Sequence, residues 1–299
     1  MHHLRRALFL VFAGLLITVP LSAEDGVRLL IVKSGKVGYL DKVGAEVIAP
    51  QFTLGGRFSE GLASVMMSDG EPGKQWGFID PQGKVVIPPQ FAAAGEFSEG
   101  LARVQVGNKW GYVDRNGTMV IQPAYQLCYE FRSGYAQAQG KTKWGLIDRL
   151  GKWVVEPQYQ DITNLADGVY GYWRDYSSKW GFRNLNGETV IAEKFSRAGP
   201  FADGLAPARN EQDLWGYVNL KSEWVIPPQY TGALAFAEDR AAVEVAHRKW
   251  GYVDHTGEMV IEANFDRAGS FLSGVAGIEI GGEYGYIDLS GNFLWSGKK

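Results

Sequence analysis

The chain has 299 residues, of which 45% are hydrophobic, with 30 Lys and Arg, 33 Asp and Glu and a single Cys. This length allows a sizeable apolar core, and the slight acidic excess excludes nucleic acid as an expected partner. Because Cys128 is alone, an intramolecular disulfide is also excluded, so burial has to stabilise the fold.

The N-terminus has the order of a secretion signal. Arg5 and Arg6 precede an apolar run from Ala7 to Leu21, and small residues follow up to Ala23. The run contains Pro20 and is shorter than the roughly 20 apolar residues that a membrane-spanning helix needs. We therefore expect a signal peptide over residues 1–23 that is cleaved near Ala23, with a retained anchor as the alternative.

The expected mature chain, residues 24–299, is predicted to be one domain in the periplasm or outside the cell. It keeps 28 basic and 33 acidic residues, a net formal charge of −5. We expect it not to span the membrane once the signal is removed.

A Trp-Gly dipeptide recurs along this domain. It stands at Trp76, Trp110, Trp144, Trp180, Trp215 and Trp250, with degenerate copies at Val37-Gly38 and Tyr284-Gly285. The successive intervals are 39, 34, 34, 36, 35, 35 and 34 residues, a period typical of repeat architectures. The sequence thus predicts eight units.

Each unit is predicted to be a three-stranded antiparallel meander. The segment Lys109 to Tyr125 is interpreted as strand, turn and strand, because Asp114-Arg115-Asn116-Gly117 at its centre has the residue types of a tight turn. Upstream, Leu101 to Val106 alternates as a further strand. The remaining residues of a unit, with a Pro, an aromatic residue and a Phe-Ser-Glu-Gly type turn, are interpreted as a connector.

The combination of Trp-Gly-aromatic-aliphatic-Asp, the Gly turn, the Val-Ile-x-Pro strand end and the Phe-x-x-Gly-x-Ala turn resembles the bacterial WG-repeat family, also described by its Lys-Trp-Gly signature. The resemblance covers essentially the whole mature chain. It implies a β-rich repeat array, and because members of this family are mostly of unassigned function, it implies no activity and no catalytic residue.

The predicted fold class is therefore all-β, a tandem array of eight meanders packed as a propeller-like ring or as an open β-spiral. No strand is visibly divided between the two ends of the chain, which favours an open or loosely closed array. We interpret the repeated Trp as a packing residue of the core and the Gly after it as allowing a close approach of another chain segment.

No catalytic residue, metal site or cofactor is predicted. The two histidines of the mature chain, His247 and His255, could lie on adjacent strands, but their spacing is not that of a zinc motif. The turn Asp residues are explained by the turns, and Cys128 is interpreted as a buried thiol. We therefore expect a protein that is not an enzyme.

Places where the repeat is broken are better candidates for binding. The insertion 68–74 has the composition of a mobile loop, and Gln126 to Glu130 is interpreted as packing. The least regular segment is Val169 to Tyr176, within which the candidate ligand-binding residues are Tyr170, Tyr172, Trp173, Arg174, Asp175 and Tyr176. Exposed aromatic and Arg side chains are typical of protein contacts, whereas a locally repacked strand would explain half of these residues.

The leading hypothesis is an exported, non-enzymatic protein-binding or scaffold module of the cell envelope, with an envelope or extracellular protein as partner. The first alternative is a protein that binds polysaccharide or peptidoglycan. The second is a glycan hydrolase, since a ring with one Asp in each unit could bring two carboxylates to a hydrolytic distance.

Overall fold

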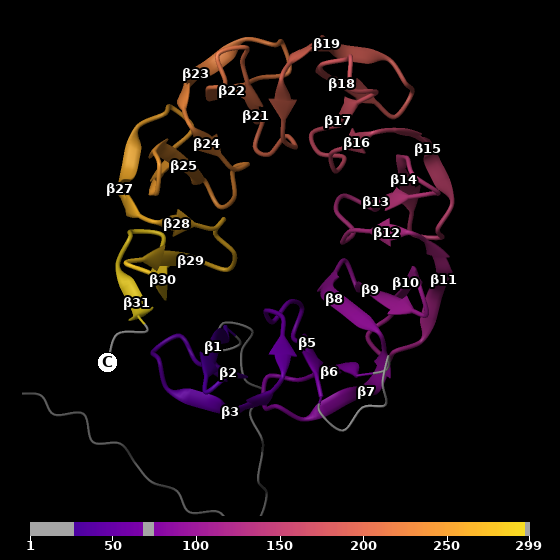
Figure 1. Ribbon diagram of the computed structural model, residues 1–299, viewed down its shortest axis with the longest axis vertical. Helices are drawn as coiled ribbons and strands as arrows, with labels where there is room; N and C mark the ends of the chain where they lie inside the picture. Colours follow the sequence, from indigo (N-terminus) through magenta and orange to yellow (C-terminus); the bar gives the residue numbers. More distant parts are fainter. Residues whose placement is uncertain (1–26, 68–74, 297–299) are drawn as a thin grey trace, which may run out of the picture.

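The computed structural model describes residues 27–67 and 75–296, and every regular element in these ranges is a strand. The strands form eight small antiparallel sheets, the blades of a propeller ring (Figure 1). The predicted signal peptide, residues 1–23, and the insertion 68–74 lie outside the described residues. Within the described ranges, no helix is long and apolar enough to cross a membrane.

Blades 1 to 4 contain β1 (Leu29–Lys33), β2 (Lys36–Leu40) and β3 (Glu46–Phe52); β4 (Leu54–Gly55), β5 (Ala63–Met66), β6 (Trp76–Ile79) and β7 (Val85–Phe91); β8 (Ala93–Ser98), β9 (Leu101–Val106), β10 (Lys109–Val113) and β11 (Met119–Tyr125); β12 (Leu127–Cys128), β13 (Tyr135–Gln139), β14 (Trp144–Asp148) and β15 (Trp153–Tyr159). Blades 5 to 8 contain β16 (Asp161–Ile162), β17 (Val169–Trp173), β18 (Trp180–Asn184) and β19 (Thr189–Phe195); β20 (Arg197–Ala198), β21 (Ala206–Arg209), β22 (Trp215–Val218) and β23 (Trp224–Tyr230); β24 (Gly232–Ala233), β25 (Ala241–Ala246), β26 (Lys249–Val253) and β27 (Met259–Phe265); β28 (Arg267–Ala268), β29 (Val275–Ile280), β30 (Glu283–Asp288) and β31 (Phe293–Ser296).

Seven blades have four strands in chain order, which we call inner, second, third and outer by their distance from the ring axis (Figure 1). The predicted meander corresponds to the second, third and outer strands. The inner strand was not predicted, because in six blades it is only two residues long and shows no alternation. It comes from the start of the predicted connector, directly after the outer strand of the preceding blade. Blade 1 has only three described strands, β1, β2 and β3.

The Gly of the Trp-Gly pair allows the close approach that was predicted. A Cβ placed on this Gly in blades 1 to 7 would lie 2.2 to 2.8 Å from a carbonyl oxygen of the outer strand. In the blade of Trp110, the pairing of the third and outer strands shifts in register between Trp110 and Tyr112. The Gly and this bulge together let the two strands approach each other locally.

The Trp itself is less buried than predicted. It packs at the edge of the core clusters, for example Trp110 and Trp250, and the most buried copy, Trp180, is 8% exposed. The residues two and three positions after the Trp are deeper, since Tyr112 and Val113 are both 0% exposed. Tyr112 packs with residues of the next blade and Val113 with residues of the preceding blade.

The turns between the third and outer strands have the predicted chemistry. Oδ1 of Asp114 accepts the backbone N–H groups of Asn116 and Thr118, both at 2.9 Å, and Gly117 has a φ of 81°. Ser222, which replaces this Gly in blade 6, also adopts a positive φ, of 68°. The backbone geometry of the turn is thus kept where the Gly is lost.

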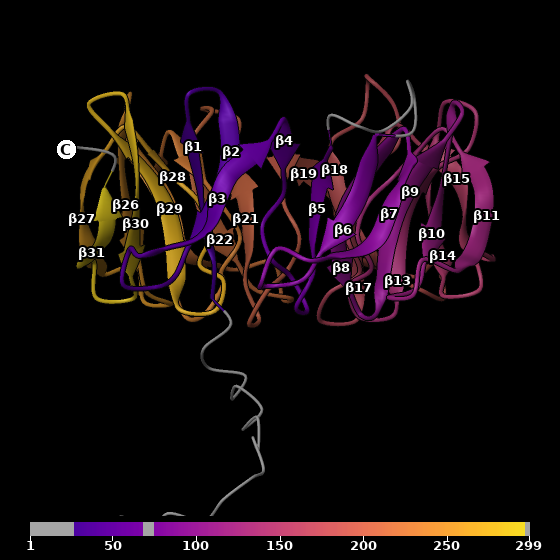
Figure 2. The ribbon, with the colours of Figure 1, turned by 90° about the horizontal axis from the view of Figure 1, so that it is seen from below.

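The alternation of strand directions puts the connections on two faces, seen at the top and bottom of the side view in Figure 2. Loops between second and third strands lie on one face, which we call the hairpin face. Turns between inner and second strands and between third and outer strands lie on the other, the turn face. On the turn face, the Glu60 carboxylate accepts the N–H of Gly100 in the next blade at 2.9 Å. Corresponding carboxylate bonds join Glu99 to Gly134, Asp167 to Gly204 and Glu238 to Gly274.

The ring is closed, although the sequence favoured an open or loosely closed array. Buried Leu29, Ile31 and Leu40 of blade 1 pack with the partly buried Tyr286 and Trp295 of blade 8. The closure therefore uses side-chain packing like that of the other interfaces between blades. No strand is shared across this seam between described residues.

We predict that Gly145→Ala lowers the free energy of unfolding by about 3 kcal/mol, since its Cβ would lie 2.2 Å from the carbonyl oxygen of Val155 and the strands would have to separate. Denaturant unfolding followed by Trp fluorescence measures this loss. Gly277→Ala is the matched control, because the nearest atom to its new Cβ is at an ordinary 3.7 Å. Equal stability of the two variants would contradict this interpretation of the Trp-Gly pair.

Candidate functional site

The segment predicted to bind a ligand is divided between the core and the surface. Tyr170 and Tyr172, in the second strand of blade 5, are both 2% exposed. Their rings lie 6.2 and 5.2 Å from the ring of Tyr159, and the Arg183 guanidinium lies 4.6 Å from the ring centre of Tyr172. Burial raises the pKa of both hydroxyl groups. These two tyrosines are packing residues, and a partner at the surface cannot reach them.

The next residues form a loop on the hairpin face, which we call the aromatic hairpin, residues 173–178. Tyr176 is 81% exposed and meets Trp173 edge to face, with ring centroids 5.0 Å apart and planes at 87°. The Trp173 indole N–H donates to the carbonyl oxygen of Ser178 at 3.1 Å. One nitrogen of Arg174 donates to both carboxylate oxygens of Glu193 at 2.6 and 2.7 Å.

Asp175 fixes the conformation of this loop through hydrogen bonds to another residue of the same loop. Its Oδ1 accepts the hydroxyl of Ser177 at 2.6 Å and the backbone N–H of Ser177 at 3.0 Å. The bond from the Ser177 hydroxyl is the main reason that the pKa of this carboxyl is lowered. Asp175 therefore shapes the loop, and Trp173, Arg174 and Tyr176 remain as the side chains that a partner can contact.

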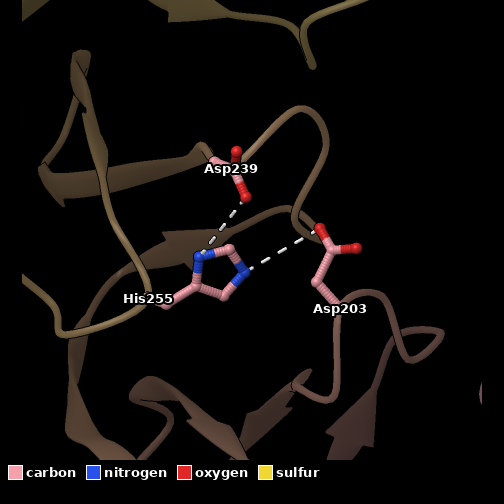
Figure 3. A group of neighbouring side chains, drawn as sticks. All are labelled: Asp203, Asp239 and His255. Carbon is pink, nitrogen blue, oxygen red and sulfur yellow. Dashed lines mark ion pairs between the residues drawn. The ribbon is translucent and has the colours of Figure 1, made fainter.

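The structure brings together a second group that the sequence did not reveal. Asp203, Asp239 and His255 meet on the turn face, with one nitrogen or oxygen of each within 4.8 Å of the others (Figure 3). Asp203 belongs to blade 6, and the other two belong to blade 7.

The two histidines lie at opposite ends of one strand. His247 is exposed in the loop before β26, whereas His255 follows the end of β26. The expectation that the two histidines could be neighbours on adjacent strands is therefore wrong.

One departure from the repeat signals this group. Asp239 occupies the turn position that is Gly in blades 2 to 6 and in blade 8, and it keeps a positive φ of 61°. A side chain in this backbone conformation costs about 1 kcal/mol. The sequence alone could have revealed that this turn position lacks a Gly. It could not have revealed that Asp239 lies near Asp203, because Asp203 belongs to another blade.

His255 lies beside two carboxylates of the turn face. Its Nε2 lies 3.8 Å from Asp203, and its Nδ1 lies 4.0 Å from Asp239. Both distances are longer than a hydrogen bond, and both carboxylates stand on the same side of the ring (Figure 3). We interpret the group as a bridge in which each ring nitrogen contacts a different carboxylate, and a metal ion bound by all three side chains is the alternative.

The same place in blade 4 holds a permanent cation. Arg149 donates to the carbonyl oxygen of Glu99 at 2.7 Å, pairs with its carboxylate at 3.5 Å and lies over the ring of Phe131. His255 likewise stacks on Phe236, with ring centroids 4.2 Å apart. In both blades the position after the turn Asp thus places a nitrogen-bearing side chain, stacked on a Phe ring, against the turn of the preceding blade.

Cys128 has the environment of a structural thiol. It is 0% exposed, and burial is the main reason that its pKa is raised to about 12. Because the thiolate is the reactive form, this side chain is a poor nucleophile.

Comparisons with known proteins agree with this geometry. The profile of the family described as WG containing repeat matches residues 38–70, 76–110, 110–139, 144–172, 180–212, 215–246 and 250–284. The chain belongs to the WG-repeat family. No curated protein matches it.

Solved structures resemble this WG-repeat chain in fold alone. BamB from Moraxella catarrhalis is similar with a TM-score of 0.54 at 15% identity, over 91% of this chain and 90% of that one. A eukaryotic initiation factor gives 0.57 at 11% identity, over 91% and 85%. The computationally designed Ika8 protein gives 0.53 at 9% identity, over 90% and 95%. These likenesses support an all-β, eight-bladed propeller.

We predict that His255→Arg leaves the thermal unfolding temperature unchanged, since Arg149 fills the same place in blade 4. His255→Ala should cost about 1 kcal/mol, because it removes both the ring stacking on Phe236 and the contacts with the two carboxylates. Calorimetry with and without Zn²⁺ measures both effects. If Zn²⁺ raises the unfolding temperature of the wild type and not that of His255→Arg, the group is a metal site and the bridge is the wrong interpretation.

Proposed function

We propose that this WG-repeat β-propeller is an exported, non-enzymatic module that binds a protein partner or serves as a scaffold in the bacterial cell envelope. The signal-like order of residues 1–23 supports export to the periplasm or the exterior. The net charge of −5 expected for residues 24–299 supports a partner other than nucleic acid.

The observation that carries the proposal is the aromatic hairpin. Trp, Tyr and Arg are the residues most enriched at the energetic centres of protein interfaces, and here Trp173, Arg174 and Tyr176 are held together on one loop. The Trp173 indole and the Arg174 guanidinium are already fixed by hydrogen bonds to Ser178 and Glu193. Side chains fixed in advance lose less conformational entropy when a partner binds.

The ring orientation within the hairpin favours a protein over a glycan. Sugar rings stack on flat aromatic faces, whereas the planes of Trp173 and Tyr176 stand at 87° to each other. The two rings therefore offer no common platform. An edge-to-face pair beside an arginine is better suited to the irregular side chains of a protein.

The turn carboxylates support a role other than hydrolysis. Oδ1 of Asp254 accepts the backbone N–H groups of Thr256 and Glu258 and the hydroxyl of Thr256. The hydroxyl bond is the largest contribution that lowers the pKa of Asp254. Burial alone would raise the pKa of Asp288, but the bonds that its carboxylate accepts from Asn292 and Ser290 outweigh this effect and leave the pKa lowered. Carboxylates held in the ionised form by turn bonds are poor general acids.

We predict that Tyr176→Ala weakens capture of the partner from an envelope extract at least tenfold, about 1.4 kcal/mol, and that Arg174→Ala has a similar effect. Leu150→Ala is the control, since this side chain is 85% exposed on the opposite face. Unchanged capture by both hairpin variants would contradict the proposed site. Absence of any protein partner, together with quenching of Trp fluorescence by glycans, would support the glycan-binding alternative.

A further inference from the structure

The inner edge of blade 1 differs from that of every other described blade. In the seven other sheets an inner strand pairs with the second strand, whereas β1 is the edge strand of its sheet. In blade 1, Leu30 of the second strand pairs with Tyr39 of the third strand. In blade 2, Ser64 pairs in the same way with Phe78. Leu30 is therefore the counterpart of Ser64. By the same register, Val32 of β1 corresponds to Met66.

The full blades show what this edge normally binds. In blade 2 the backbone N–H of Gly56 donates to the carbonyl oxygen of Ser64 at 2.8 Å. The same bond, at 2.8 to 3.0 Å, joins Tyr129 to Gln137, Thr163 to Gly171, Gly199 to Pro207, Leu234 to Ala242 and Gly269 to Gly277. The counterpart acceptor in blade 1 is the carbonyl oxygen of Leu30, for which the described residues supply no such N–H group.

A tyrosine hydroxyl occupies this acceptor instead. The hydroxyl of Tyr39 donates to the carbonyl oxygen of Gly56, the inner residue of the next blade. Corresponding bonds join Tyr112 to Tyr129, Tyr217 to Leu234 and Tyr252 to Gly269. At the seam, Tyr286 donates directly to Leu30 at 3.0 Å. The Tyr286 hydroxyl is thus diverted to the backbone group that an inner strand would bind.

A cavity adjoins this edge, which has no inner strand among the described residues. A cavity of about 1070 Å³ opens at the seam and is lined by Leu30 and Arg28 of blade 1, by Arg57 and Phe58 from the start of blade 2, and by Gly277 and Tyr286 of blade 8. Val32, farther along β1, is 62% exposed. Both the backbone groups and the volume needed for one more short strand are therefore present.

We propose that the inner edge of β1 accepts an extended segment of a partner protein as the missing inner strand of blade 1. This inference rests on the proposed protein-binding function and names a second contact for it. The occupant is a polypeptide, because an edge strand presents alternating N–H and C=O groups that only another backbone matches in spacing.

The inner strands of the other blades indicate the sequence that fits. The second residue of each inner strand is small or aliphatic, namely Gly55, Ala94, Cys128, Ile162, Ala198, Ala233 and Ala268. We expect the same in the partner segment, followed by a residue whose N–H binds the Leu30 carbonyl oxygen. The carbonyl group of that residue then receives the Tyr286 hydroxyl, as Gly56 receives that of Tyr39.

Val32→Pro tests the site. In blade 2 the carbonyl oxygen of Met66 accepts an N–H from Thr53, so the backbone of this position points towards the inner strand. A proline at Val32 removes a donor from the open edge and leaves the bonds to β2 in place. Val32→Ala is the matched control, because it shortens the side chain and keeps the N–H. Equal unfolding temperatures of the two variants establish that both fold.

The probe is a synthetic peptide that copies residues 266–271, the segment of blade 8 that contains the inner strand β28. We expect it to slow hydrogen exchange of the residue 32 amide at least tenfold, both in the wild type and in the Val32→Ala control, and not to bind Val32→Pro. Absence of slowing at millimolar peptide overturns the proposal. So does a Val32 amide that is protected before peptide is added, since the edge would then be filled by the chain itself.

Capture of the envelope partner separates this inference from the proposed function. If Val32→Pro loses the partner and Val32→Ala keeps it, the edge is the second contact. If both variants capture it equally, the protein binds through another surface and the strand-acceptor site is wrong. If no variant and no wild-type protein captures any partner, the proposed function itself fails.

Discussion

The close approach of the third strand to the outer strand at the Trp-Gly pair is the constraint on which this propeller depends. At Gly145 there is no room for even one methyl group, because the carbonyl oxygen of Val155 lies 2.2 Å from where it would stand. The bulge next to this Gly brings Leu146, which is 0% exposed, into the interface between blades. A requirement of the backbone within one sheet thereby sets the packing between sheets, and its recurrence at a nearly constant period generates the ring.

A residue that serves this packing is needed in each unit. Because its side chain is buried between blades, it is not available to bind a partner. The side chains free for other roles are those at which units differ. Tyr176 and Arg174 replace an ordinary short loop in blade 5, and Asp239 replaces a turn Gly in blade 7. Blade 1 differs by the absence of a described inner strand, and the diverted bond from Tyr286 to Leu30 marks that difference in the hydrogen bonding of the seam.

Much of the fold could be predicted from local sequence. The period of Trp-Gly gave the number of units, and the Asp114 to Gly117 pattern gave the turn, because both are determined by interactions within a few residues. The two-residue inner strands could not be predicted, since strands as short as Leu54–Gly55 carry no periodic signal. Ring closure through Leu29 and Trp295 depends on contacts between the two ends of the described chain, which no local pattern reports.

The candidate sites were predictable to a smaller extent. Departure from the repeat drew attention to residues 170–176, but the pattern could not separate buried Tyr172 from exposed Tyr176. Both belong to one aromatic run, and only the start of the hairpin at Trp173 divides them. The meeting of Asp203 with His255 joins residues of different blades across the turn face. Such contacts follow from the curvature of the ring, which is a property of the assembled fold.

The most direct measurement is a parallel scan of folding stability and partner capture over two sets of alanine substitutions. One set takes the buried repeat residues two positions after the Trp, such as Tyr112 and Tyr252, and the other takes the exposed departures Arg174 and Tyr176. We predict that the first set lowers the free energy of unfolding while the remaining folded protein captures the partner normally, and that the second set lowers capture at unchanged stability. The opposite result would contradict this account: variants of the repeat residues that fold but no longer capture the partner, while the hairpin variants capture it normally. The residues that build the fold would then also be the residues that bind.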